Sequence, residues 1–364
     1  MHSTRRWDPC ISHRGQEVRD FISGYFNDSN RKSLLIAGAG FDPRSCVISN
    51  FFGPFQEHIH AILIQENRPT SNAILAGKAK ENTESLQGIF KSSALMPVSI
   101  FDGSAVVGGR NVLNSLKNQN FDEISDVIVD VSALSVGVSF PIIRFLLEHT
   151  ARKPGSLEVH IFVTQDPELD ASIQMRSGDT PDFVHGFRGD TGLNSAADAA
   201  KLWLPQLASG RGPALRKIHD FVSPDDTCPI LPFPASNPRI GDELAEEFLT
   251  ELESTWSVDT RNIVYADEDD PLDLYRTILR LDDLRKPVFE HVGGSRLILS
   301  PDGSKIMALG ALMAALERNL PVAYLEAIGY DLDPTAPGPT TAPNLVHVWL
   351  EGGVYPHPQT AQKT

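Results

Sequence analysis

The hydrophobic positions of the chain fall into short continuous runs separated by segments with helical periodicity. In the N-terminal half, the runs SLLIAGAG, AILIQEN, PVSIF, DVIVDVS and EVHIFVT begin at Ser33, Ala61, Pro97, Asp126 and Glu158. Apolar runs of this length, bounded by Gly, Pro and Asp, are typical of strands buried on both faces. Because strands that alternate with helices form parallel sheets covered by helices, the pattern predicts an α/β fold.

A second series of apolar runs follows in the C-terminal half. CPILPFP, NIVYADE, SRLILS and PVAYLEA are predicted strands that begin at Cys228, Asn262, Ser295 and Pro321. The region between the two series is rich in turn residues, and SAADAAKLWLPQLA within it predicts a helix that ends near Pro205. NLVHVWLEGG, near the C-terminus, predicts a final strand at a sheet edge.

These patterns divide the chain into two tandem Rossmann-like domains, each with three layers and a mainly parallel sheet. A length of 364 residues fits two domains at roughly 150 residues each. In chain order, the expected parts are an N-terminal extension (1–30), a first Rossmann-like domain (31–166), a connector or insertion (167–224), a second Rossmann-like domain (225–350) and a C-terminal tail (351–364).

The two halves also share an order of motifs, which indicates an internal duplication. DVIVDVSALSVGVSFPIIRFLLEH and SRLILSPDGSKIMALGALMAALER align without gaps and place Ser135 on Ser304. Identity in this window is low, so chance recurrence of common residues is the alternative. Two other features of the first half recur in the second. Pro43-Arg44 near a helix start matches Pro238-Arg239, and Glu66 in an E-x-x-P motif matches Glu268 in another.

Charge and composition narrow the classes of function. The chain has 32 Lys and Arg against 47 Asp and Glu, a formal net charge of −15, which disfavours bulk nucleic-acid binding but permits a pocket for a small phosphorylated ligand. Three separated cysteines without a C-x-x-C pair fit a reducing cytoplasm. There is no long apolar run and no secretory h-region, so we expect a cytoplasmic protein without a membrane span.

The sharpest local motif is SPDGSKIMALGA, which begins at Ser300 and joins a predicted strand to a helix. Gly303 permits a tight turn, and Ser304 and Lys305 open the helix. Free N–H groups at a helix N-terminus, together with a hydroxyl and a lysine, form a phosphate cradle. The alternative is a serine that only caps the helix.

This strand–Gly-Ser-Lys–helix pattern resembles the ligand loop of CARF domains (CRISPR-associated Rossmann-fold domains). AGAGFDPRS and PFPASNPR stand where CARF domains place further ligand contacts, and two such folds in one chain are similar to SAVED domains. The first half departs from the pattern, because VSALSVG lacks the Gly-Lys pair. The resemblance implies the sensing of a cyclic nucleotide in prokaryotic defence or signalling, through an effector protein or through self-assembly into a homo-oligomer.

The candidate binding residues all follow predicted strands, where open parallel sheets bind their ligands. No cofactor and no metal is expected. The candidates are Arg44, Glu66, Ser132, Ser135, Arg239, Glu268, Gly303, Ser304 and Lys305.

Three other hypotheses stay open. Ser304 and Lys305 with a carboxylate would suit a phosphodiesterase of the ring-nuclease type or an N-glycosidic hydrolase. Gly38 and Gly40 after a strand, with Glu66 after the next one, would suit an NAD-binding protein, although the third glycine of that motif is missing. Two degenerate domains with structural ion pairs would suit a scaffold.

Overall fold

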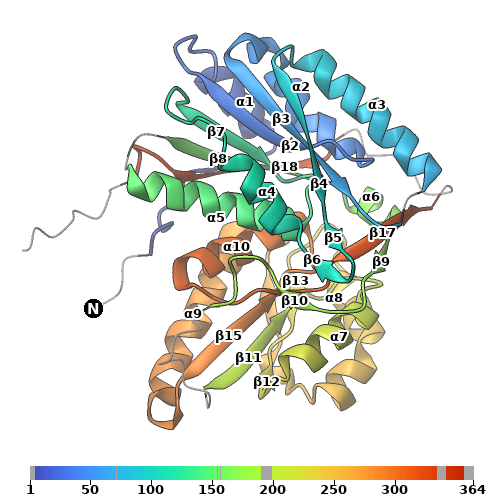
Figure 1. The fold of residues 1–364 in the computed structure, drawn as a ribbon. Coiled ribbons are helices and arrows are strands. Elements are labelled where there is room, and N and C mark those ends of the chain that lie inside the picture. The colour runs from blue at the N-terminus through green and yellow to red at the C-terminus, as the bar shows by residue number, and fades with distance from the viewer. Residues whose placement is uncertain are drawn as a thin grey trace, which may run out of the picture.

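The computed structural model describes residues 5–189 other than 71, 154 and 156, together with 199–333 and 342–355. Its larger sheet has seven strands in the order β1-β18-β8-β7-β2-β3-β4 (Figure 1). Their bounds are β1 Ser12–Arg14, β2 Ser33–Gly38, β3 Ile59–Asn67, β4 Ser93–Ser99, β7 Asp126–Asp130, β8 Glu158–Gln165 and β18 Asn344–Glu351.

Five of these strands are parallel, and their order is that of a Rossmann fold. Across the sheet they stand in the order β4-β3-β2-β7-β8. Numbered along the chain, this is third, second, first, fourth and fifth. Beyond β8, β18 extends the sheet as an antiparallel strand, and β1 pairs antiparallel with β18 at the edge. The predicted α/β class with mainly parallel sheets is confirmed.

Helices cover both faces of the larger sheet, because its strands are apolar on both sides. α1 (Gln16–Tyr25), α2 (Val47–Phe52) and α3 (Ala73–Ile89) bury their apolar residues on one face. α4 (Gly108–Leu116) and α5 (Val136–Arg152) cover the other face. Most of α5 is buried, since its core cluster continues into the second unit.

The second unit has a smaller parallel sheet with the same strand order. β12-β11-β15 form its centre, bridges join Gln206 to Ile230 and Leu299 to Val322, and β13 pairs with β14. With β12 and β13 counted together as the second strand and β16 as the fifth, the order across this sheet is again third, second, first, fourth and fifth along the chain. The bounds are β11 Ala200–Pro205, β12 Asp226–Thr227, β13 Ile230–Pro232, β14 Val264–Ala266, β15 Ser295–Ser300 and β16 Ala323–Tyr324.

The helices of the second unit also form two layers. α7 (Gly212–Val222) and α8 (Ile240–Glu247) pack on one face. α9 (Pro271–Phe289) and α10 (Lys305–Arg318) pack on the other, where one hydrophobic core runs through both units. α10 is apolar nearly all round because it faces its own sheet and the larger unit at once.

Short elements complete the fold. A two-stranded antiparallel ribbon of β9 and β17 joins the units. The remaining bounds are β5 Phe101–Asp102, β6 Ala105–Val106, β9 Ile173–Ser177, β10 Asp182–Phe183, β17 Ala327–Leu332, α6 Pro167–Ser172, and the short helical turns η1 Pro43–Cys46, η2 Gly53–His58, η3 Glu251–Thr255, η4 Thr260–Asn262 and η5 Glu290–Val292.

The tertiary structure corrects two sequence predictions. KLWLP was predicted as helix within a connector, but it forms β11, the central strand of the smaller sheet, and Leu202, Trp203 and Leu204 are buried on its two faces. The SAAD part of that predicted helix lies outside the described residues. Both faces of this strand must be apolar, which is why a continuous apolar run outweighs the helix-forming alanines beside it.

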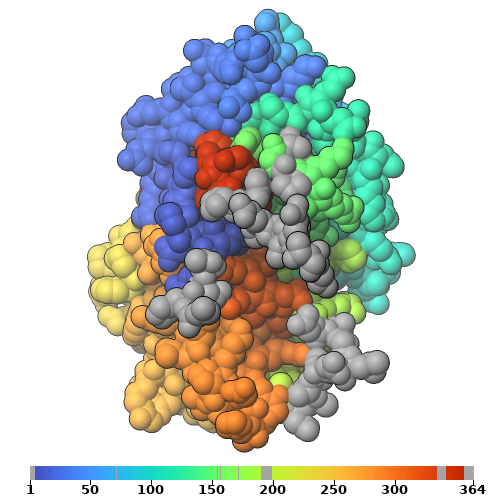
Figure 2. Space-filling model, turned by 90° about the vertical axis from the view of Figure 1, so that its left-hand side faces the viewer, coloured from blue at the N-terminus to red at the C-terminus, as the bar shows by residue number. Residues whose placement is uncertain are grey.

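The two ends of the chain do not follow the predicted division either. β1 and α1 of the expected N-terminal extension belong to the larger unit, and β18, expected in the second domain, lies between β1 and β8. Figure 2 shows the blue N-terminal region and the red C-terminal strand side by side on one face. The chain therefore crosses from the larger unit to the smaller one and returns. Residues 356–364 of the predicted tail lie outside the described residues.

One face of the larger sheet carries a chain of three histidines that ends at an aspartate. His13 Nδ1 lies 2.9 Å from Nδ1 of His347, whose Nε2 lies 3.1 Å from Nδ1 of His160. His160 Nε2 lies 3.3 Å from Oδ1 of Asp126, which also accepts a hydrogen bond from Arg31. Burial lowers the pKa of His160 and takes that of His347 well below its usual value, so both rings are neutral in the folded protein.

We expect the folded state to lose stability as the pH falls below about 6.5, the pKa of an unperturbed histidine. In the unfolded chain His160 and His347 bind protons below that pH, whereas their lowered pKa values mean that they bind protons less readily in the folded protein. Because the unfolded state then binds more protons, acid favours it, by up to about 1.4 kcal/mol per pH unit for each ring. Urea unfolding at a series of pH values between 7.5 and 5 measures this slope.

His347→Phe removes one of the two buried rings, and it should flatten the pH slope. His291→Phe is the matched control, since His291 is exposed in η5, directly after α9. Equal slopes for the wild type and His347→Phe would contradict the assignment of the acid sensitivity to this chain of rings.

Candidate functional site

A cavity of about 670 Å³ lies between the two units. Its walls are the segments that follow β2, β3 and β7 of the larger sheet, those that follow β11 and β15 of the smaller sheet, and residues of the β9–β17 ribbon. The carboxyl ends of both parallel sheets therefore face one space, which is where open α/β sheets bind ligands. A cavity of this size accommodates a small organic ligand.

The cavity brings together all but one of the predicted binding residues. Arg239 is the exception: it is exposed, does not line the cavity, and its backbone N–H bonds to Asn237 at the start of α8. It follows the second strand of its sheet, whereas Arg44 follows the first. The predicted residues that line the cavity are Arg44, Glu66, Ser132, Ser135, Glu268, Gly303, Ser304 and Lys305.

The N-terminus of α10 opens onto the cavity as the Gly-Ser-Lys motif predicts. Ser304 caps the helix, its Oγ accepting a hydrogen bond from the Met307 N–H at 3.2 Å. Gly303 is needed for close approach, since a Cβ there would lie 2.8 Å from Oε1 of Gln206. The turn thus holds the first N–H groups of α10 at the cavity wall, where they favour an anion.

Lys305 reaches from the smaller unit to the larger one. Its Nζ donates a hydrogen bond to the carbonyl oxygen of Leu134, in the segment between β7 and α5. Burial lowers the pKa of Lys305, and the nearby Arg44 guanidinium lowers it further, while Glu66 and other carboxylates act in the opposite direction. Lys305 has no carboxylate ion-pair partner among the described residues, so its charge is available to an anionic ligand.

The N-terminus of α5, the counterpart of α10 in the larger unit, is closed by the protein itself. Glu66 Oε1 accepts hydrogen bonds from both the N–H (2.8 Å) and the Oγ (3.0 Å) of Ser135. Its Oε2 accepts from Arg68 at 2.6 Å, and Arg68 also donates to Oε1 of Glu326 at 2.9 Å. Burial raises the pKa of Glu326, with Arg68 opposing the rise. Glu66 is therefore a capping carboxylate, and its oxygens are not open as a ribose-binding acid would require.

Ser132 and Glu268 also have partners within the protein. Ser132 is buried; its Oγ donates to Asp130 Oδ1 and accepts from the Thr164 N–H at 2.8 Å. Burial raises the pKa of Asp130 to about 7, against the lowering effect of the hydrogen bonds from Ser132. Glu268 Oε2 accepts from the N–H and the Oγ of Ser236, at 2.9 and 3.0 Å. These contacts shape the walls of the cavity.

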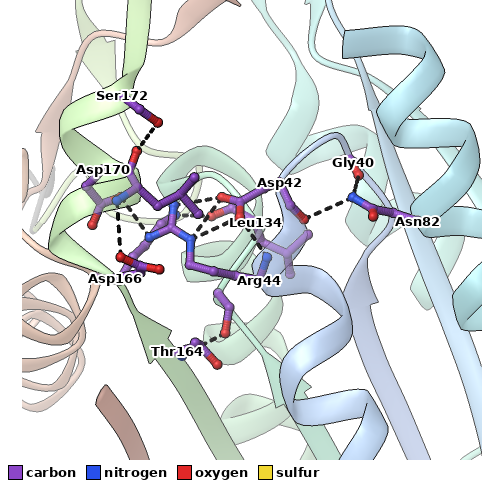
Figure 3. Close-up of polar contacts among 12 residues, drawn as sticks. Gly40, Asp42, Arg44, Asn82, Leu134, Thr164, Asp166, Asp170 and Ser172 are labelled. Atoms are coloured by element: carbon purple, nitrogen blue, oxygen red, sulfur yellow. Dashed lines mark hydrogen bonds and ion pairs between the residues drawn. The ribbon is translucent and has the colours of Figure 1, made fainter. Parts of the chain in front are cut away.

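Arg44 forms buried ion pairs within the protein. Figure 3 shows its guanidinium between Asp42 and Asp170, with Nη2 2.7 Å from Asp42 Oδ2 and Nη1 2.7 Å from Asp170 Oδ1. Burial by itself would lower the pKa of Arg44, but the two carboxylates raise it above its usual value. Asn82, also drawn in Figure 3, donates from α3 to the carbonyl oxygen of Gly40 and braces this loop.

Sequence reasoning missed several residues that line the cavity. Arg211 follows β11 and donates from Nε to Asp302 Oδ1 at 3.0 Å; it occupies the place after the first strand that Arg44 occupies in the larger unit. Arg211 stands before Gly-Pro at a helix start, which is a recognisable pattern. It was overlooked because the segment that forms β11 was predicted to be a helix. The ring centroids of Phe41 and Tyr330 lie 5.4 Å apart with the rings tilted by 51°, and the Arg68 guanidinium lies 5.2 Å from the centroid of the Tyr330 ring.

The shared strand order also changes which residues correspond between the units. Ser135 and Ser304 both precede the helix after the fourth strand, in agreement with the sequence alignment. Glu66 ends the second strand of its sheet, whereas Glu268 follows the third of the other. Internal duplication stays a prediction, with Arg44 and Arg211 rather than Arg44 and Arg239 in equivalent places.

Two general features of the described part of the chain bear on the site. No group of three or more His, Cys, Asp or Glu side chains is arranged there to hold a metal ion. Within the same residues, no helix is both long enough and apolar enough to cross a membrane.

Comparison with known proteins gives distant likenesses. No family model and no curated protein matches the chain. A structure described as a type III CRISPR defence DNA nuclease activated by cyclic oligoadenylate aligns at 12% identity with a TM-score of 0.46, over 84% of this chain and 68% of that one. A cyclopropane-fatty-acyl-phospholipid synthase-like protein from Lactobacillus casei ATCC 334 aligns at 13% identity with a TM-score of 0.28, over 91% of this chain and 88% of that one.

Proposed function

We propose that the cavity binds a small phosphorylated ligand of the nucleotide class, of which a cyclic nucleotide is the leading candidate. The contact of Lys305 with Leu134 carries this proposal, because it places a lysine without a carboxylate partner on the boundary between two Rossmann-like units. The open N-terminus of α10 adds N–H groups suited to a phosphate. Gly303, Ser304 and Lys305 form the proposed phosphate site.

Ligand binding at this boundary would serve sensing. A ligand that touches both units stabilises the arrangement in which they face each other, and it can pass that preference to an effector protein or to another copy of the chain. The choice of a cyclic nucleotide, and of prokaryotic defence or signalling as the setting, comes from the sequence resemblance to CARF and SAVED domains. The remaining lining residues Arg44, Glu66, Ser132, Ser135 and Glu268 are proposed to shape the cavity around the ligand.

The test is a thermal-shift screen of the purified chain. The panel contains cyclic di-, tri- and tetranucleotides, NAD and nucleoside triphosphates. A ligand present at about 100 times its Kd should stabilise the protein by roughly 2.7 kcal/mol, which gives a clear rise in Tm. A rise with a cyclic nucleotide supports the proposal, and a rise with NAD alone contradicts the choice of a cyclic nucleotide as the ligand. No rise with any nucleotide at high micromolar concentration would favour the scaffold hypothesis. Loss of the added ligand over time would indicate the hydrolase hypothesis.

A further inference from the structure

The two helix N-termini that meet at the cavity differ in charge. At α5, the Ser135 N–H and Oγ already bind the Glu66 carboxylate. The Glu326 carboxylate lies over the same turn, so closely that a Cβ at position 137 would collide with its Oε2. A second phosphate at this end would meet two carboxylates, whereas α10 presents N–H groups and Lys305. The phosphate of a bound ligand therefore belongs at α10.

A second feature at the α10 end calls for a hydrogen-bond donor. Asp302, two residues before the Ser304 cap, lines the cavity with its side chain fully buried. Its Oδ1 accepts from Nε of Arg211, but its Oδ2 has no hydrogen-bond partner among the described residues. A buried carboxylate oxygen without a donor is costly, and a ligand hydroxyl would supply the missing bond.

Arg211 fixes this carboxylate in place. Two guanidinium nitrogens, Nε and Nη2, donate to the same Oδ1, so Oδ2 receives no hydrogen bond from Arg211. Arg211 keeps its charge, since burial alone would lower its pKa but Asp302 raises it. Asp302 is therefore held in an ion pair with Arg211, close in sequence to the groups that favour a phosphate.

We infer that Asp302 binds the ribose 2′-hydroxyl of the nucleotide whose phosphate contacts the N-terminus of α10, so that the site selects ribonucleotides over deoxyribonucleotides. This inference rests on the proposed nucleotide binding and adds the sugar to it. In a 3′-linked ribonucleotide the free 2′-hydroxyl is next to the phosphate. A donor and an anion side by side match Asp302 and the Gly303–Lys305 turn, which are adjacent in the chain. An acidic residue that holds a ribose hydroxyl has precedent in dinucleotide-binding folds.

The experiment compares two probes on the full chain, 3′,3′-cyclic diadenylate and its 2′-deoxy counterpart, by isothermal titration calorimetry. The wild type should bind the ribose form about tenfold or more tightly, as expected when a charged acceptor loses its hydrogen-bond donor. In Asp302→Ala this ratio should fall to about one. Asp302→Asn retains the size of the side chain if the alanine variant does not fold, and it should still reduce the ratio because a neutral acceptor binds the hydroxyl less strongly.

Asp282→Asn is the matched control. Asp282 is also a buried aspartate in an ion pair, 2.5 Å from Lys286, but it lies on α9 and does not line the cavity. This variant should keep the wild-type ratio. Equal binding of the two probes by the wild type, or an unchanged ratio in both Asp302 variants, would overturn the inference while leaving nucleotide binding in place. Binding of neither probe, with no other nucleotide bound in the screen, would overturn both.

Discussion

Lys305→Ala should remove most of the stabilisation that a bound nucleotide gives to this protein. Lys305 is the lining cation with no carboxylate partner among the described residues, and it stands at the helix terminus that favours an anion. Loss of a buried charge partner typically costs binding about 2–5 kcal/mol. If the Kd rises about 100-fold, a ligand that stabilises the wild type by about 2.7 kcal/mol would stabilise the variant by only about 0.4 kcal/mol.

The measurement is the ligand-induced change in Tm at a fixed nucleotide concentration, with each variant also measured alone. Lys201→Ala is the matched control, because Lys201 Nζ likewise donates to a backbone carbonyl, that of Val222 at 3.0 Å, but lies at the opposite end of its sheet. Its ligand response should equal that of the wild type. An undiminished response in Lys305→Ala would exclude the α10 end as the phosphate site.

Arg68→Ala should have the largest effect on stability among the variants considered. The Arg68 side chain is only 7% exposed and joins Glu66 at the end of β3 to Glu326 beside β17, residues that are far apart in the chain. Removing the guanidinium leaves two buried carboxylates without their cation. Breaking a buried ion pair in this way costs about 3–5 kcal/mol. Urea unfolding at pH 7.5 gives the loss directly.

Arg176→Ala provides the comparison. Arg176 of β9 pairs with Asp331 of β17, but the Arg176 side chain is half exposed. An exposed pair contributes about 0–1 kcal/mol. The loss caused by Arg68→Ala should also shrink at acidic pH. Burial already raises the pKa of Glu326, and without Arg68 that pKa rises further, so the Glu326 carboxylate becomes neutral at a less acidic pH. A loss below about 1 kcal/mol, or one that does not change with pH, would show that Arg68 does not compensate these charges.

The described contacts separate the positively charged residues of the cavity into two groups with different roles. Arg44, Arg68 and Arg211 are each neutralised by carboxylates and hold the walls together. Lys305 and the open end of α10 provide positive potential for a ligand. A chain with a net charge of −15 can therefore bind one anion at a defined place while it repels long polyanions.

The sequence by itself determined where most buried strands lie and which of their ends carry polar groups. Apolar runs placed β2, β3, β7, β8 and β15 correctly, because a strand covered on both faces must be continuously apolar, and this requirement is local. Ser304 was found at the start of a helix for the same reason, since a helix start is recognised within a few residues, and the alignment of the two halves placed Ser135 on it.

The tertiary structure alone decided what those polar groups contact. Arg68 meets Glu326 across 258 positions of sequence, and Lys305 meets Leu134 across 171, so no local pattern reveals either contact. The same holds for β11 and β18, whose places depend on which strands they pair with. Hydrophobic periodicity records how each segment is buried. Which cations form ion pairs, and which lack a carboxylate partner, depends on the segments that the folded chain brings together. The distances between such segments are set only by the complete fold.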